Sequence, residues 1–385
     1  MLLVMCITLG GCVKSRRGVG GVPVLHSIAG PSKVAIDLAV RRGLNFLLKT
    51  QNKNGTFGRP NRTKGLNILA PGLDAHAGYR LGTTGLCLAG MIENYDGRPA
   101  VEQAIDRAAR ALVLQLPKMR RPTVSVLYNV WGHAYGIQGL LRYRDFPNAD
   151  KRLFKQVDAV IGHQIKMLDR YVTVNGGWGY YDFNLGYQKP SGGPESFTTA
   201  TVLIALKEAE LAGFAINAKT VKISVKAIQL QRMPDFAYAY AFQHRVAPNA
   251  LINRTPGSLG RSQVCNTALR MWGDAAVTDQ RIKNWLSRLF VRNGWLRMGM
   301  KRPRPHESWA AVAGYFYYYG HLYAGFAIEQ LPLKDRPLFQ KHLAKLMVEL
   351  QEKDGSWWDF PLYNYHQQAG TGMVLMTLSR CRAAR

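Results

Sequence analysis

The sequence predicts an all-α fold, an (α/α)6 toroid in which an outer ring of six helices surrounds an inner ring of six. Two observations predict it. A short motif recurs at a spacing that divides the chain into six units of about 60 residues. Each unit also contains an amphipathic helix followed by a helix of low charge. Outer helices that shield buried inner ones form two concentric rings, with an axial cavity between the inner helices.

The recurring motif is clearest near the two ends of the chain. QNKNGTFG at 51–58 returns as QEKDGSWW at 351–358, an offset of 300 residues. Between them, a helix-like segment followed by a Gly/aromatic turn recurs at 175–183, 231–242 and 291–299. The aromatic landmarks of these turns are Phe57, Trp178, Phe236, Trp295 and Trp357. The first step between landmarks spans two units, with a degenerate unit near 112–122.

The two helices of a unit differ in their distribution of charge. The segments 39–51 and 342–355 place leucines at helical spacing on one face, which is typical of an outer helix. The second helices are rich in Ala, Gly and aromatic residues, which favours burial on every side and close helix contacts. These inner segments are 82–92, 132–141, 196–213, 262–273, 308–326 and 367–378.

The composition indicates a large core and a basic surface. Hydrophobic residues make up 47% of the chain, and 51 Lys and Arg against 24 Asp and Glu give a net charge of +27. Such a charge favours anionic partners, namely nucleic acid, acidic polysaccharide or an anionic membrane surface. The alternative is a solvated basic surface with no specific partner.

The N-terminus predicts export. The apolar run MLLVMCITLGGC ends in small residues before Cys12, as in a bacterial lipoprotein signal, where the cysteine is acylated after cleavage. We therefore expect residues 1–30 to be a signal segment with a flexible basic tether, and 31–385 to be one toroid domain. This predicts a chain anchored by lipid at the cell envelope, facing its anionic surface and not nucleic acid. The alternative is a cytosolic protein with a frayed apolar N-terminus.

The repeat resembles that of a known family. Gln51 with Gly55 and Phe57, and Gln351 with Trp357, are similar to the QW-type repeats of the terpenoid cyclase and protein prenyltransferase superfamily, in particular squalene-hopene cyclases. The resemblance covers residues 33–382 and implies the toroid. In that family the Gln and the aromatic ring tie adjacent outer helices together, so the motif implies architecture and no chemistry.

The catalytic motifs of the superfamily are missing. Squalene cyclases protonate an alkene with an acid of an Asp-x-Asp-Asp cluster, and no aspartates stand at that spacing. Prenyltransferases hold zinc through an Asp-x-Cys pair and a His, but Gln263 stands two residues before Cys265. The Gly-Cys-Gly-Glu-Gln of complement-type thioester toroids is absent as well. We expect neither a metal nor a cofactor.

Candidate site residues gather at the starts of the inner helices, where loops converge on one mouth of the toroid. Glu195 and Glu307 each precede a serine at the start of a predicted inner helix, and His133 and His366 occupy similar places in other units. Carboxylates and imidazoles together are typical of a carbohydrate-cleaving site. The alternative is that each Glu-Ser pair only caps its helix.

Further residues at the same mouth are candidates for ligand binding. Tyrosines at a cavity wall suit stacking on sugars or an apolar tunnel, although core packing explains most of them. Basic loop residues such as Arg302 and Arg304 would attract an acidic ligand. The ligand-binding candidates are Asp74, His76, Arg261, Tyr315 and Tyr319.

Three functions remain open from the sequence. The first is a monomeric envelope protein that binds a lipid or glycan in its cavity without established catalysis, which the missing acid cluster favours. The second is a hydrolase or lyase acting on an acidic polysaccharide, which the charge and the Glu-Ser pairs favour. The third is an atypical terpene cyclase with a displaced acid. We expect an apolar, deep cavity for a lipid and an open one with facing carboxylates for a glycan.

Overall fold

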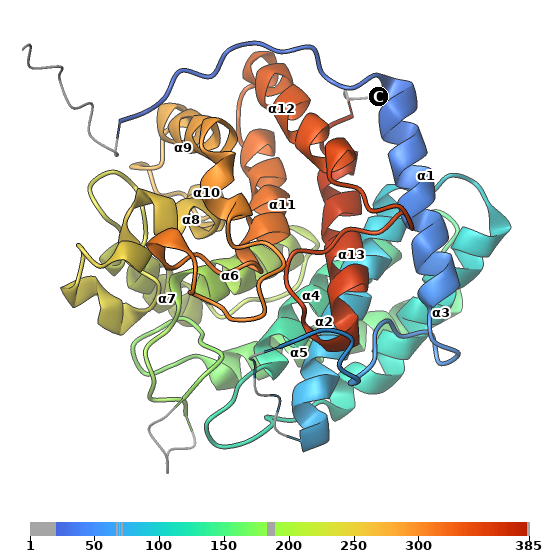
Figure 1. The fold of residues 1–385 in the computed structure, drawn as a ribbon. Helices are drawn as coiled ribbons and strands as arrows, with labels where there is room; N and C mark the ends of the chain where they lie inside the picture. Colours follow the sequence, from blue (N-terminus) through green and yellow to red (C-terminus); the bar gives the residue numbers. More distant parts are fainter. Residues whose placement is uncertain (1–20, 67, 69, 71, 183–188, 383–385) are drawn as a thin grey trace, which may run out of the picture.

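The computed structural model describes residues 21–382 except 67, 69, 71 and 183–188. Within these residues the chain is helical, and its helices alternate between two rings (Figure 1). The outer helices are α1 (Lys33–Thr50), α3 (Pro99–Gln115), α5 (Phe154–Tyr171), α7 (Ala218–Leu230), α9 (Asp279–Val291) and α12 (Arg336–Glu349). The inner helices are α2 (Gly72–Glu93), α4 (Asn129–Arg144), α6 (Ser196–Leu211), α8 (Thr255–Met271), α11 (Phe316–Glu329) and α13 (His366–Ser379). A short helix, α10 (Asn293–Arg297), follows α9.

The inner helices form a closed ring. Each packs against the next in the order α2, α4, α6, α8, α11 and α13, and α13 packs back against α2. In the outer layer, α1 contacts α12 and α3, which joins the first unit to the last. The predicted all-α toroid of two concentric rings is therefore confirmed.

Burial separates the two kinds of helix as their sequences predict. Helix α1 buries one face, with Val40, Leu44 and Leu47 toward the core and charged residues outward. In α8 every residue from Thr255 to Leu269 is buried. A helix that is apolar or uncharged on most of its circumference is stable only inside a shell of other helices, which the outer ring supplies.

The turn motif links one outer helix to the next. Gly55 and Gly355 adopt φ values of +82° and +91°, and an added Cβ would lie 2.2 Å and 2.6 Å from carbonyl oxygens of α3 and α1. The side chain of Gln51 donates from Nε2 to a carbonyl of α3 at 2.9 Å, and that of Gln351 donates to a carbonyl of α1 at 2.8 Å. Only glycine combines this left-handed conformation with so close a backbone approach.

Inner helices α2 and α4 approach each other through glycines. An added Cβ on Gly85 would lie 2.2 Å from the carbonyl oxygen of Tyr135, and one on Gly139 would lie 2.8 Å from that of Gly85. Small residues at these positions let the two backbones touch, as the Gly-rich inner segments predict.

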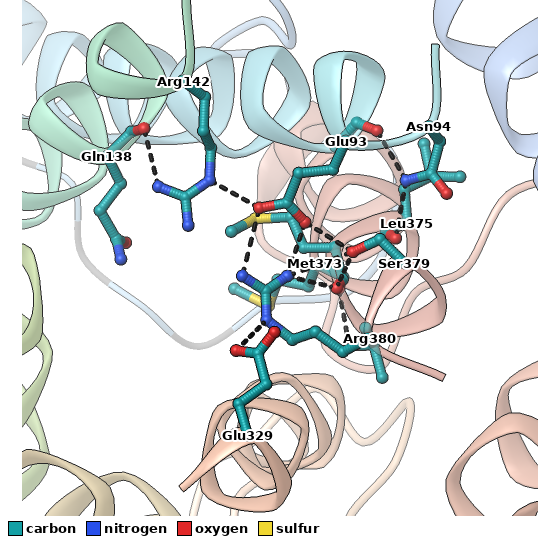
Figure 2. A network of polar contacts seen from close by, with 12 residues as sticks. Glu93, Asn94, Gln138, Arg142, Glu329, Met373, Leu375, Ser379 and Arg380 are labelled. Carbon is teal, nitrogen blue, oxygen red and sulfur yellow. Dashed lines mark hydrogen bonds and ion pairs between the residues drawn. The ribbon is translucent and has the colours of Figure 1, made fainter. Parts of the chain in front are cut away.

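A network of charges joins the C-terminal ends of the inner helices (Figure 2). Glu93 of α2 accepts from Arg142 of α4 at 2.6 Å and from Arg380, just after α13, at 2.5 Å. Arg142 also pairs with Glu208 of α6 at 2.8 Å, and Arg380 with Glu329 of α11 at 3.1 Å. Five of the six inner helices are thus joined at one end of the ring.

The first described residues lie on the outer ring. The His342 side chain in α12 donates to the carbonyl of His26 at 2.8 Å, and Arg292 donates to that of Gly21 at 3.0 Å. Cys12 and the predicted signal segment lie outside the described residues. In the part of the chain that the structure describes, no helix has the length and apolar character needed to cross a membrane.

Candidate functional site

A cavity of about 520 Å³ opens among the N-terminal halves of the inner helices, at the end opposite the charge network. Its walls come from α2, α4, α11 and α13, from the first turn of α6, and from the loops that precede these helices. Most of the lining side chains are aromatic, among them Tyr79, Trp131, Tyr135, Phe197, Phe316 and Tyr319. The cavity therefore has the size and the apolar character of a small-molecule site.

Helical periodicity directs these aromatic rings to the axis. Trp131 and Tyr135 are four residues apart in α4, so they share one face, and their rings stack at a centroid distance of 5.9 Å. Trp131 also stacks on Phe197 of α6 at 6.1 Å, and Phe197 meets Phe316 of α11 edge-on at 5.0 Å. Rings from three inner helices thus form one continuous wall.

One side of the cavity carries a chain of hydrogen-bonded hydroxyl groups. The hydroxyl groups of Tyr180 and Tyr240 are hydrogen-bonded, and the Tyr240 hydroxyl lies 3.2 Å from that of Tyr315. The Tyr315 hydroxyl lies 3.0 Å from Nε2 of His306, whose Nδ1 lies 2.7 Å from the carbonyl oxygen of Ala311. Tyr180, Tyr315 and His306 line the cavity, whereas Tyr240 lies behind them. We call Tyr180, Tyr240, Tyr315 and His306 the polar wall.

Two buried ionisable groups stand behind the polar wall. The guanidinium of Arg261 lies 5.4 Å from the ring centroid of Tyr240 and donates to the carbonyls of Tyr238, Gly257 and Ile252. Burial lowers the pKa of Arg261 to about 10.

The other group is Glu195, whose Oε2 accepts from the backbone N–H of Tyr180 at 3.1 Å. Burial raises the pKa of Glu195 to about 8, so this carboxyl is largely protonated at neutral pH.

Of the four candidate catalytic residues, the structure places only His366 in the cavity lining. Glu195 lies behind Tyr180, and Glu307 is exposed. His133 is buried between the rings, where Nδ1 lies 2.6 Å from Oε1 of Gln164 in α5. Burial lowers the pKa of His133 to about 4. The four side chains therefore do not converge on one cavity.

The expected equivalence of Glu307 and Glu195 is wrong, because the helix that follows Glu307 starts later than predicted. Glu195 directly precedes α6, but α11 begins at Phe316 and not at Ser308. Ala310 and Ala311 have φ values of +59° and +54°, so a continuous α-helix cannot run from Ser308 to Phe316. The loop before α11 thus carries Glu307 outward and brings its neighbour His306 to the cavity.

The ligand-binding candidates divide in the same way. Tyr315 and Tyr319 line the cavity, and Tyr319 donates to the carbonyl of Phe197 at 3.0 Å. Asp74 is exposed, and His76 packs edge-on against a tyrosine ring outside the lining. Arg261 reaches the site only through the ring of Tyr240, as described above.

The sequence-based prediction missed His306 and Trp131. Each lies beside a chosen residue: His306 precedes Glu307, and Trp131 stands two positions before His133. Positions two apart in a helix face in nearly opposite directions, so Trp131 points to the cavity while His133 points to the outer ring. Trp131 and Tyr135 are aromatic and four residues apart, and this spacing could have predicted which face of α4 points to the cavity.

No group of three or more His, Cys, Asp or Glu side chains suited to a metal ion occurs among the described residues. Cys87, Cys265 and Cys381 are buried and free, and burial raises the pKa of the Cys265 thiol to about 12. A thiol with so high a pKa stays protonated at neutral pH and does not act as a thiolate.

Known structures share this architecture. An inactive variant of the alpha-1,6-mannanase GH76A of Salegentibacter sp. HEL1_6, in complex with alpha-1,6-mannotetrose, aligns with 90% of this chain and 98% of its own, at 10% identity and a TM-score of 0.56. The type II terpene cyclase MstE from Scytonema, in complex with geranylgeranyl dihydroxybenzoate, aligns with 90% of this chain and 97% of its own, at 12% identity and a TM-score of 0.51. No protein-family model and no curated protein sequence matches the chain. The (α/α)6 toroid is therefore confirmed by structural likeness, which at these identities concerns the fold.

Proposed function

We propose that this protein binds an elongated apolar lipid of the isoprenoid type in its axial cavity. The observation that carries the proposal is the aromatic lining of a cavity of about 520 Å³. Apolar surface transferred from water to such a site is stabilised by roughly 25 cal/mol per Å². Aromatic faces on several inner helices suit a branched, unsaturated hydrocarbon chain.

The hydrogen bonding of the walls disfavours a glycan in the same place. A bound sugar needs a partner for each buried hydroxyl group, because an unsatisfied one costs about 1–3 kcal/mol. The Tyr319 hydroxyl is already engaged by Phe197 and Thr201, and those of Tyr180 and Tyr315 by the polar wall. The cavity therefore offers a sugar few unused partners, one of which is Nε2 of His366, buried and without a hydrogen-bond partner among the described residues.

The lining also disfavours hydrolysis and alkene protonation. Glycoside hydrolysis uses two carboxyl groups that flank the scissile bond, and no Asp or Glu is among the described residues that line the cavity. The stretches that the structure leaves undescribed contain no Asp or Glu in the sequence. Aromatic walls would stabilise a carbocation, but generating one from an alkene requires a strong acid at the cavity. Binding without chemistry is the function that these residues support best.

The N-terminal sequence supports a place for this lipid-binding protein at the cell envelope. On this proposal Cys12 carries the acyl anchor, and the basic chain lies near an anionic surface. A lipid-binding cavity held close to a membrane would exchange its ligand over a short distance.

Binding of geranylgeraniol to the purified protein tests the proposed function. We expect a one-to-one complex by native mass spectrometry and quenching of tryptophan fluorescence, since Trp131 lies in the wall. Ala369→Trp, which fills the cavity from α13, should weaken binding at least tenfold, whereas Ala276→Trp at an exposed turn should not. Binding of alpha-1,6-mannotetrose but not of geranylgeraniol would refute the proposal.

A further inference from the structure

The polar wall has a defined hydrogen-bond direction. Nδ1 of His306 faces the carbonyl oxygen of Ala311 at 2.7 Å, so Nδ1 must carry a proton. In the neutral ring Nε2 is then an acceptor, and the Tyr315 hydroxyl donates to it. Tyr240 consequently donates to Tyr315, and Tyr180 donates to Tyr240. While His306 is neutral, every hydroxyl proton of the wall points toward the histidine.

Protonation of His306 frees the last hydroxyl proton of this chain. With a proton on both ring nitrogens, Nε2–H donates to the Tyr315 oxygen, which releases the Tyr315 hydroxyl proton for another acceptor. The released donor lies in a residue that lines the cavity. A negatively charged acceptor placed there would favour the protonated ring, because opposite charges at short range stabilise each other.

A buried positive charge faces the same wall. Arg261 is 1% exposed and donates to three backbone carbonyls, and no carboxylate among the described residues forms an ion pair with it. An unpaired buried charge is costly unless another charge compensates it. Its guanidinium lies 5.4 Å from the ring of Tyr240 and 6.0 Å from that of Phe316, which lines the cavity.

The other ionisable groups around His306 leave this positive charge uncompensated. Burial lowers the pKa of His306, opposed by its hydrogen bond to Ala311 and aided by the charges of Arg261 and of His244, which lies edge-on to Tyr240. Glu195 faces Tyr180 and Tyr240, but it is largely protonated at neutral pH, as described above. The polar wall is therefore electropositive around a histidine that is neutral.

From this arrangement we infer that the polar wall binds the carboxylate head of an amphipathic lipid and that His306 takes up a proton when the carboxylate binds. The apolar tail lies along the aromatic walls, so the inference rests on the proposed function and specifies its ligand as a lipid acid. A small carboxylate head suits this wall better than a phosphate or diphosphate, because the wall frees one hydroxyl donor while the Arg261 guanidinium stays engaged by backbone carbonyls. The Tyr315 hydroxyl, freed by the protonated His306, donates the hydrogen bond to the head group.

The test compares geranylgeranoic acid, geranylgeraniol and geranylgeranyl phosphate as ligands of the full-length protein at pH 6.5 by titration calorimetry. We expect the acid to bind at least tenfold more tightly than the alcohol, because a carboxylate accepts charge-assisted hydrogen bonds that a hydroxyl group does not. Repeating the titration in buffers of different ionisation enthalpy should reveal uptake of a proton with the acid and none with the alcohol.

Two variants assign the effect to the wall. Tyr315→Phe keeps the ring but removes the hydroxyl group, and it should lower affinity for the acid about tenfold while leaving the alcohol unchanged. His306→Gln should abolish the proton uptake. Tyr95→Phe, which removes a hydroxyl group that donates to Glu102 outside the cavity lining, is the matched control and should bind both ligands as the wild type does.

Equal binding of acid and alcohol, or acid binding without proton uptake, would overturn the inference while leaving lipid binding intact. Tighter binding of the phosphate than of the acid would overturn the carboxylate assignment. Failure of all three ligands to bind would refute the proposed function itself.

Discussion

The charge network at the C-terminal ends of the inner helices predicts a large, pH-dependent effect of Glu93→Gln (Figure 2). Burial alone would raise the pKa of Glu93, but Arg380 and Arg142 outweigh it and lower the pKa to about 2 from an ordinary 4.5. A depressed pKa means that the ionised carboxylate stabilises the fold above pH 4.5, and that this contribution disappears as the pH falls toward 2. Neutral Gln keeps the shape of the side chain but cannot pair with either arginine.

The magnitude follows from the two pKa values. Each unit of difference corresponds to about 1.4 kcal/mol, so the charge of Glu93 contributes about 3 kcal/mol to the free energy of unfolding at pH 7. By the same relation the contribution falls to about 1.5 kcal/mol at pH 3. Removing one member of a buried ion pair costs roughly 3–5 kcal/mol in other proteins, which agrees with the estimate for pH 7.

Urea denaturation followed by circular dichroism at pH 7 and pH 3 measures both values. The matched control is Glu349→Gln, which removes an exposed carboxylate 3.8 Å from Lys345 and should change the unfolding free energy by less than about 1 kcal/mol. A Glu93→Gln variant as stable as the control at pH 7 would refute the reasoning. A loss that is as large at pH 3 as at pH 7 would refute the electrostatic cause.

Three further predictions concern packing and location. Gly85→Ala should lower the free energy of unfolding by about 1–3 kcal/mol, because its Cβ would clash with a carbonyl of α4. Gly162→Ala, where the added Cβ meets open space, should raise the free energy of unfolding by about 0.5–1 kcal/mol. Thermal unfolding of both variants checks the sign of each change. Gln351→Met should cost about 1 kcal/mol by the same measurement, because it removes the hydrogen bond from the turn after α12 to α1, and an unchanged stability would contradict that role. Cys12→Ser should abolish partitioning into the detergent phase, and partitioning that persists would contradict acylation at this residue.

The repeat spacing sufficed to predict the fold because a pair of one outer and one inner helix recurs six times along the chain. Gln51 and Gln351 occupy the same place in their units, and each contacts the next outer helix around the ring. Closure then follows, because the last unit must meet the first. Alternation of amphipathic and uncharged helices further predicts which helices lie outside, since burial of charge without a partner is costly.

The site could be predicted only in part, because it depends on how the units differ. Tyr315, Tyr319 and His366 were found at the cavity because they lie at or near the starts of inner helices. Glu307 was misplaced because the loop before α11 breaks the repeat through Ala310, whose positive φ has no signature in an alanine. Loop conformation of this kind is set by tertiary contacts, and residue type alone does not reveal it.

The two ends of the inner ring serve different purposes: one stabilises the fold, and the other is the end at which we propose that the ligand binds. At the C-terminal ends, Glu93, Arg142 and Arg380 satisfy one another, and such a network resists rearrangement because each charge would be stranded without its partner. At the N-terminal ends, the charge of Arg261 has no carboxylate partner among the described residues, and protonation of His306 frees the last hydroxyl proton of the chain that ends there. The uncompensated positive charge near Arg261 favours a ligand that brings a negative charge into the cavity. Comparing the binding of geranylgeranoic acid with that of geranylgeraniol therefore tests this reasoning most directly.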